Sequence, residues 1–153
     1  MAGWTNKGKM RLLETIRGVA LPTNFYCMLC TSADAPDADS NTVGGAGGVT
    51  EVSTGNGYST GGISLTKNAT DFDEISEDDS GNLGSLKIRD LVWTASGGTL
   101  PASDSARYAV ITDDAATVAD REIWFFFDLA SDRQVSSGQT LTLADCDIRL
   151  TES

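Results

Sequence analysis

The stretch of sequence that decides the fold is REIWFFFDLAS, residues 121–131. Its centre consists of five consecutive large apolar residues, Ile123 to Phe127, and four of these five are aromatic. Polar residues bracket the run on both sides. The run therefore predicts a β-strand that is apolar on both of its faces.

The alternation of a strand divides this run into two sets of side chains. Ile123, Phe125 and Phe127 are expected on one face, and Trp124 and Phe126 on the other. A sandwich strand normally buries one face only. The face with Trp124 and Phe126 therefore needs a cover, and the candidates are the N-terminal helix, a long loop or another subunit. If nothing covers that face, it forms an interaction patch.

Short extended segments separated by turn clusters make up most of the remaining chain. The expected strands are NFYCMLCTS (24–32), GSLKIRDLVWTAS (84–96), ARYAVITDD (106–114), QTLTLAD (139–145) and CDIRLTE (146–152), with weaker extended pieces near 49–53 and 62–66. The acidic stretch 71–82 reads as a loop or a weak edge strand, and 33–48 as a loop. This pattern predicts a mainly β fold, an antiparallel β-sandwich or jelly-roll-like single domain.

The predicted strand 84–96 changes its alternation near Arg89 and Asp90. A β-bulge at this point would let Leu86 and Ile88 face the core, followed by Leu91 and Trp93.

The first 20 residues predict a short amphipathic helix. Thr5 or Asn6 can cap a helix that runs to about Arg17, and Met10, Leu13 and Ile16 recur at three-residue spacing. Gly18 suits the C-terminal cap. We therefore expect a helical segment over residues 1–20 and the β-sandwich domain over residues 21–153.

The charge of the chain is strongly asymmetric. The net charge is −11, with no histidine, but residues 1–20 carry four basic side chains and one acidic side chain. The remaining chain is therefore close to −14. An acidic body repels phosphate backbones, so nucleic-acid binding is not expected. A basic tip on an acidic body can steer docking onto an acidic partner, or it can be only a solvated helix end.

Membrane insertion and secretion are not expected either. The chain has no run of about 18 apolar residues that could span a bilayer. The N-terminus lacks the uninterrupted apolar region of a signal peptide.

The three cysteines predict no disulfide framework, because their number is odd. Cys27 and Cys30 match a C-x-x-C motif but lie within a predicted strand, where residues three apart point to opposite faces. A dithiol pair or a shared metal is therefore not expected, and the thiols should be buried as small apolar groups.

Two short segments match catalytic motifs in their residues but not in their sequence context. The segment GYSTG (57–61) matches the nucleophile elbow, but the chain has no histidine base and no helix is expected after the serine. The triplet DSG (79–81) lies in an acidic, solvated stretch rather than after an apolar strand. No catalytic residue and no cofactor are expected, so the chain is predicted not to be an enzyme. A loop Ca²⁺ site in the acidic stretches remains an alternative to a solvated acidic surface.

The order of segments resembles a family of small structural proteins of tailed bacteriophages. The resemblance covers nearly the whole chain, and its most specific parts are the stretches GNGYS (55–59), VWTASGG (92–98) and GQTLTL (138–143). It implies a β-sandwich with an N-terminal helix and a place in the virion. The chain is similar both to capsid decoration (cement) proteins, which sit on the shell and are often trimers, and to short proteins labelled tail-fibre.

The resemblance alone does not separate these two roles. Fibres favour elongated, repetitive sequences, and this chain shows no internal repeat. We therefore expect a capsid decoration protein on the capsid exterior, made in the cytoplasm of a bacterial host. The implied partners are the major capsid protein and further copies of the chain, as a homotrimer. We expect the basic N-terminal segment, through Trp4, Lys7, Lys9 and Arg11, to contact the shell or a neighbouring copy. Trp124 and Phe126 are expected to meet the helix or a subunit interface.

A tail- or fibre-associated protein that binds a receptor or glycan is the alternative function. In that case exposed aromatic residues such as Trp93 or Tyr58 would stack on sugars.

Overall fold

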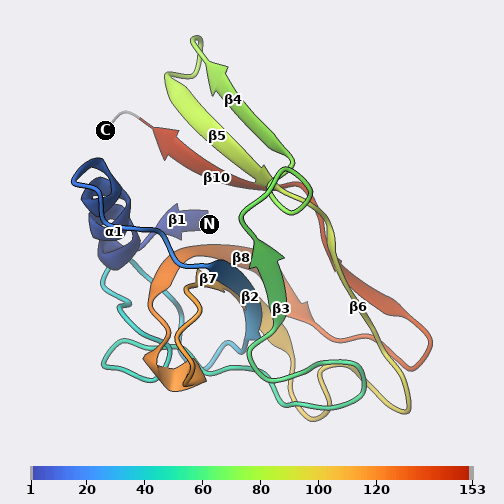
Figure 1. Cartoon of the computed structure of the whole chain (residues 1–153). Coiled ribbons are helices and arrows are strands. Elements are labelled where there is room, and N and C mark those ends of the chain that lie inside the picture. The colour runs from blue at the N-terminus through green and yellow to red at the C-terminus, as the bar shows by residue number, and fades with distance from the viewer. Residues whose placement is uncertain (1, 152–153) are drawn as a thin grey trace.

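The computed structural model describes residues 2–151, which form three antiparallel sheets and one short helix (Figure 1). The largest sheet has five strands in the order β1-β8-β7-β2-β3. Their bounds are β1 Ala2–Trp4, β8 Ile123–Arg133, β7 Ala106–Thr112, β2 Asn24–Cys30 and β3 Ile63–Thr66. The strand predicted from residues 121–131 is thus a central strand, flanked by β1 and β7.

A bent ribbon forms the second layer. Its strands are β5 Leu83–Ile88, β6 Leu91–Thr94, β9 Thr140–Leu143 and β10 Cys146–Thr151. β6 pairs with β9, and β5 pairs with β10. The short strand β4, Glu74–Asp78, extends the β5–β10 pair into a three-stranded sheet that projects from the body (Figure 1).

The alternation does change at Arg89 and Asp90, but through a break rather than the expected β-bulge, because these two residues separate β5 from β6. Ile88 and Leu91 on either side of the break are each 1% exposed. The break lets both strands turn apolar side chains inward while the ribbon changes its partner strand from β10 to β9.

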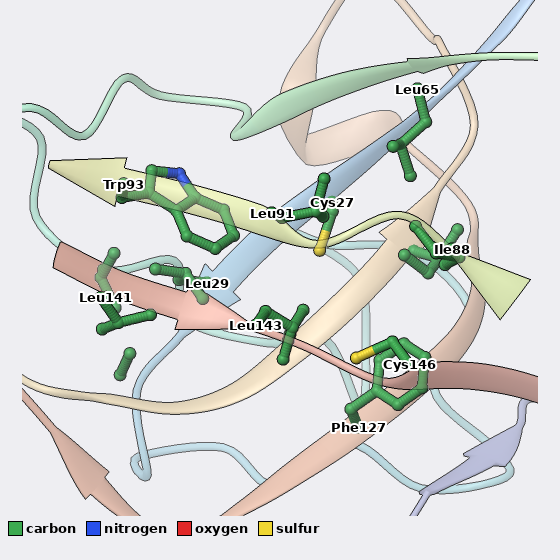
Figure 2. Packing of buried hydrophobic residues seen from close by; sticks show 14 of the residues in the cluster. Cys27, Leu29, Leu65, Ile88, Leu91, Trp93, Phe127, Leu141, Leu143 and Cys146 are labelled. Atoms are coloured by element: carbon green, nitrogen blue, oxygen red, sulfur yellow. The ribbon is translucent and has the colours of Figure 1, made fainter. Parts of the chain in front are cut away.

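The main core lies between the five-stranded sheet and the ribbon (Figure 2). It includes Cys27 and Leu29 from β2, Leu91 and Trp93 from β6, and Leu143 from β9. Burial of apolar side chains from both layers is the main stabilising contribution to such a fold. The predicted mainly β sandwich with one short N-terminal helix is confirmed.

A second, smaller core lies on the opposite side of the five-stranded sheet. Met28, Val110 and Phe126 pack there with Val43 and Val49 from the long loop before β3. This loop is therefore the cover for Phe126, one of the three candidates that the sequence left open. Both faces of the central strands are buried, which explains their continuous apolar runs.

The expected division of the aromatic run into two faces is confirmed for Phe125, Phe126 and Phe127 but was wrong for Ile123 and Trp124. Ile123 and Phe126 belong to the smaller core, whereas Trp124 and Phe125 both belong to the main core. The reason is a β-bulge: Ile111 of β7 is opposite Phe125 and Thr112 is opposite Ile123, which leaves Trp124 without an opposite residue. One extra residue in β8 reverses the alternation on either side of it.

The N-terminal helix, α1, spans Asn6–Ile16, and its N-cap is Thr5, one of the two capping residues that the sequence predicts. The Thr5 side chain caps it by accepting a hydrogen bond from the Gly8 amide at 2.9 Å. At its end, Gly18 has a φ of +84° and the Val19 amide donates to the Glu14 carbonyl, which is the geometry of a Schellman cap. A short 3-10 helix, η1 Val118–Asp120, leads into β8.

Candidate interaction surfaces

Tyr58 and Glu51 form a hydrogen-bonded pair of titratable side chains. The Tyr58 hydroxyl donates to Glu51 Oε1 at 2.8 Å and accepts from the Leu29 amide at 3.1 Å. Glu51 Oε1 also accepts from the Gly61 amide at 2.6 Å. Burial, followed by the charge of Glu51, raises the pKa of Tyr58 well above its usual range. These groups hold the loop against β2 and are occupied by structural hydrogen bonds.

The two segments that match catalytic motifs, GYSTG (57–61) and DSG (79–81), lie in turns at the surface. Ser59 of the GYSTG segment is exposed, and the next regular element after it is β3, a strand. Asp79 of the DSG triplet is exposed in the turn after β4, where Asp78 accepts hydrogen bonds from the Ser80 and Gly81 amides. Neither segment has the strand–turn–helix context or the burial that its chemistry requires.

The three cysteines are buried and free. Cys27 belongs to the main core and Cys30 to the smaller core, so they lie on opposite sides of β2, as predicted. Burial raises the pKa of all three thiols, that of Cys146 to about 12. Cysteine nucleophiles require a lowered pKa and access to solvent, and these thiols have neither.

The carboxylates of the acidic stretches do not converge on one point within residues 2–151. No group of three or more histidine, cysteine, aspartate or glutamate side chains there is arranged to hold a metal ion. In the stretch 71–82, Asp71 pairs with Arg89, and the residues of β4 are exposed. The stretch therefore includes an edge strand, one of the two expectations for it.

The aromatic residues suggested for sugar stacking are not on the surface. Trp93 is 4% exposed and Tyr58 is 2% exposed, and their rings lie 6.4 Å apart within the main core. A ring must offer one free face to a sugar, so this expectation was wrong for both residues.

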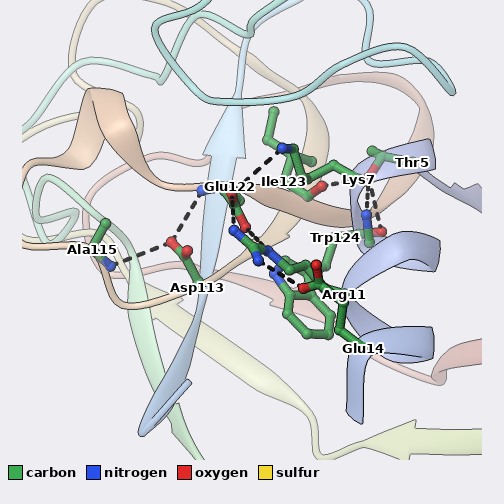
Figure 3. A network of polar contacts seen from close by, with 10 residues as sticks. Thr5, Lys7, Arg11, Glu14, Asp113, Ala115, Glu122, Ile123 and Trp124 are labelled. Atoms are coloured by element: carbon green, nitrogen blue, oxygen red, sulfur yellow. Dashed lines mark hydrogen bonds and ion pairs between the residues drawn. The ribbon is translucent and has the colours of Figure 1, made fainter. Parts of the chain in front are cut away.

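An ion-pair network anchors α1 to β8 (Figure 3). Arg11 donates to both carboxylate oxygens of Glu122, at 2.6 and 2.7 Å, and to Glu14 at 2.7 Å. Lys7 lies 3.6 Å from the Glu122 carboxylate. The hydrogen bonds from Arg11 are the main cause of the lowered pKa of Glu122. On the same side, Asp113 accepts from the Glu122 amide, and burial raises the pKa of Asp113.

Gly8 allows the close approach between the helix and the strand. A Cβ atom at this position would lie 2.7 Å from Trp124 Cα and 2.8 Å from its carbonyl carbon. Only a residue without a side chain fits here. The first turn of α1 therefore rests directly on the backbone of β8.

Most residues of the basic N-terminal segment that were expected to bind a partner have partners within the chain. Trp4 packs edge-on against Phe125 and donates from its indole nitrogen to the Arg149 carbonyl at 2.8 Å. Lys7 and Arg11 belong to the network described above. Lys9 is exposed and makes no ion pair within residues 2–151.

The two aromatic candidates, Trp124 and Phe126, are each 6% exposed. Trp124 packs beneath α1 with its ring 5.0 Å from that of Phe25. Its buried indole nitrogen has no hydrogen-bond acceptor within residues 2–151. Both residues therefore belong to the cores of a single chain and expose little of their own surface.

The outer face of α1 is apolar and exposed. Met10, Leu13 and Ile16 are 41%, 63% and 82% exposed, and they follow one another at helical spacing. Exposed Lys9 and Arg17 lie next to them in sequence. We call Met10, Leu13 and Ile16 the α1 stripe. Helices on a folded domain normally turn such a stripe inward, so the α1 stripe is a candidate contact surface.

An open groove of about 600 Å³ separates α1 from the projecting sheet β4-β5-β10, and its lining is almost entirely apolar. One wall is the inner face of that sheet, where Ile75, Leu86 and Ile148 lie side by side across three strands. Leu12 of α1 contributes to the opposite wall, and the aromatic residues Phe25, Trp124 and Phe125 of the five-stranded sheet line its base. We call this feature the apolar groove.

The sequence did not predict the apolar groove. Ile75 is an isolated apolar residue within an acidic stretch, and it is 83% exposed at the mouth of the groove. Leu150, 49% exposed, lies on the same face. An apolar residue between acidic neighbours was the available signal, but only the pairing of β4 with β5 shows which face it joins.

Comparison of the chain with protein-family models, with curated proteins and with solved structures finds no match. Within residues 2–151, no helix has the length and apolar character needed to cross a membrane.

Proposed function

We propose that this chain is a non-enzymatic structural protein of a bacteriophage virion, and that it decorates the capsid by binding the outside of the shell and reinforcing it. Its partners are the major capsid protein and other copies of itself, in a homotrimer. The observation that carries the proposal is the pair of apolar surfaces, the α1 stripe and the apolar groove. A single chain leaves both in contact with water, and exposed apolar surfaces of this kind are typical of proteins that act by association.

The distribution of polar groups supports the same function. Glu51 and Tyr58 are engaged in structural hydrogen bonds, and the cysteine thiols are buried. A decoration protein needs no reactive group, because repeated weak contacts over a lattice add up to tight binding. The resemblance of the sequence to phage structural proteins points in the same direction.

The basic N-terminal segment remains the proposed site for the shell or for a neighbouring copy. Its available part is smaller than expected, because Lys7 and Arg11 neutralise Glu122 within the chain. Lys9 and Arg17, which are exposed, are the residues of this segment that can steer docking.

Binding to isolated phage parts tests the proposal. Heads and tails are prepared from a phage that encodes this chain, stripped of the protein, and incubated separately with the purified protein. We expect sedimentation with heads to saturate at a fixed number of copies per lattice position, and the decorated heads to open at a higher temperature. Binding to tails alone would reject shell decoration and favour the tail-associated alternative.

A further inference from the structure

We propose that the occupant of the apolar groove is the α1 stripe of a second copy of this chain. The inference deepens the self-association named above and rests on it, but it can be tested without a phage particle. It assigns a specific contact between copies: the outer face of one helix against the inner face of the neighbour's projecting sheet.

The first support is the size of the groove relative to the stripe. A cavity of about 150 Å³ holds a benzene-sized group. The groove, at about 600 Å³, therefore has room for roughly four such groups. The α1 stripe offers three large side chains, Met10, Leu13 and Ile16, from a rigid helix. A helix that inserts apolar side chains at this spacing into an apolar groove is a recurring mode of protein recognition.

The second support is charge complementarity. Lys9 and Arg17 lie next to the α1 stripe in sequence, and neither makes an ion pair within the described part of the chain. Glu77 lies two residues beyond Ile75 in β4, opposite Gly84, and is therefore on the groove side of the projecting sheet. The exposed residues Asp73 and Asp79 add negative charge at the two ends of β4.

The α1 stripe of a chain cannot fill the groove of the same chain. Leu12 forms part of the groove wall, whereas Leu13, the next residue, is 63% exposed. The ion pair of Arg11 with Glu122 and the contact of Gly8 with Trp124 fix α1 in this orientation. The stripe of the same chain is thus held away from the groove, and a second copy must supply the occupant.

The contact joins two different surfaces, so it is heterologous. Such a contact closes with cyclic symmetry when the rotation between copies allows it. A trimeric ring satisfies all three stripes and all three grooves.

Sedimentation of the purified chain tests the inference through Leu13→Asp in the stripe and Ile75→Asp at the mouth of the groove. We expect the wild type to sediment as a closed oligomer with the mass of three chains, and both variants to sediment as monomers. Val92→Asp is the matched control, because Val92 is 48% exposed on β6 and does not line the groove. The three replaced side chains are exposed, so each variant should keep the circular-dichroism spectrum of the folded wild type. A wild type that stays monomeric, or a Leu13→Asp variant that keeps the oligomer, overturns the inference.

Charge reversal provides a second test. Lys9→Glu and Glu77→Lys should each weaken self-association by roughly tenfold, and the two changes in one chain should restore it. Restoration supports the contact between stripe and groove, and a double variant as weak as the single ones contradicts it.

A cross-link tests the geometry directly. A Leu13→Cys chain mixed with an Ile75→Cys chain under mild oxidation should give a disulfide-linked pair that neither variant forms alone. Absence of this product in the mixture contradicts the contact.

These results separate the inference from the proposed function. Monomers that still bind phage heads would overturn the stripe-in-groove contact but leave shell decoration intact. A closed oligomer that does not bind phage heads would overturn shell decoration but leave the stripe-in-groove contact intact.

Discussion

Replacement of Gly8 by alanine is the most informative single test of how the helix is attached. In a free helix alanine is favoured over glycine by about 1 kcal/mol, so the sequence alone predicts a more stable protein. In the structure, the new methyl group would lie 2.7 Å from Trp124 Cα. The obstacle is the backbone of a central strand, which cannot rotate away as a side chain can. The helix must therefore lift from β8.

The expected magnitude follows from the cost of overpacking. Extra methylene groups in a packed region cost about 1–3 kcal/mol, and the rigid neighbour places Gly8→Ala at the upper end. After the gain in helix propensity is subtracted, the free energy of unfolding should fall by about 2 kcal/mol. For a domain of this size each kcal/mol shifts the melting temperature by about 2–4 °C, so we expect a decrease of about 4–8 °C.

Thermal unfolding followed by circular dichroism measures this shift. Gly84→Ala is the matched control, because a Cβ at Gly84 meets nothing within 4 Å. We expect its melting temperature to stay close to that of the wild type. If Gly8→Ala melts at or above the wild-type temperature, the described contact between α1 and β8 is wrong.

Three further predictions concern buried and paired groups. Tyr58→Phe removes the hydroxyl that accepts a hydrogen bond from the Leu29 amide at 3.1 Å. This change should lower the free energy of unfolding, measured in urea, by about 1–3 kcal/mol. An unchanged urea midpoint would contradict the hydrogen bond. No thiol should react with a thiol reagent in the native protein, whereas three should react in denaturant; a fast native reaction of Cys146 would disprove its burial. The lowered pKa of Glu122 contributes stability that is present above its unfolded value of about 4.3 and is lost as the pH falls through the folded value. The loss of stability caused by Arg11→Ala should therefore shrink as the pH falls through that range, and a pH-independent difference would count against the ion pair.

The sequence predicts the features that depend on neighbouring residues. The helix boundaries follow from Thr5 and Gly18, whose capping roles are local. The break at Arg89 and Asp90 is visible because it interrupts an alternation within one strand.

Features that depend on pairing between distant segments are not visible in this way. The run Ile123 to Phe127 looks regular, but its faces are set by a bulge that exists only in the pairing with β7. The ion pair of Arg11 with Glu122 joins residues 111 positions apart. Trp4, Lys7 and Arg11 were expected to be available to a partner, because the sequence shows the ring of Trp4 and the charges of Lys7 and Arg11. It does not show that all three side chains make contacts within the chain. The apolar groove likewise is lined by residues from eight separate helices and strands, which no local pattern connects.

The central claim, that the chain acts by binding repeated positions on a particle, is tested most directly by cryo-electron microscopy of intact phage particles that encode it. The account predicts density with this fold on the outer surface of the shell, present at every equivalent lattice position and absent when the gene is deleted. Density of this fold confined to the tail, or no such density anywhere on the particle, would contradict it.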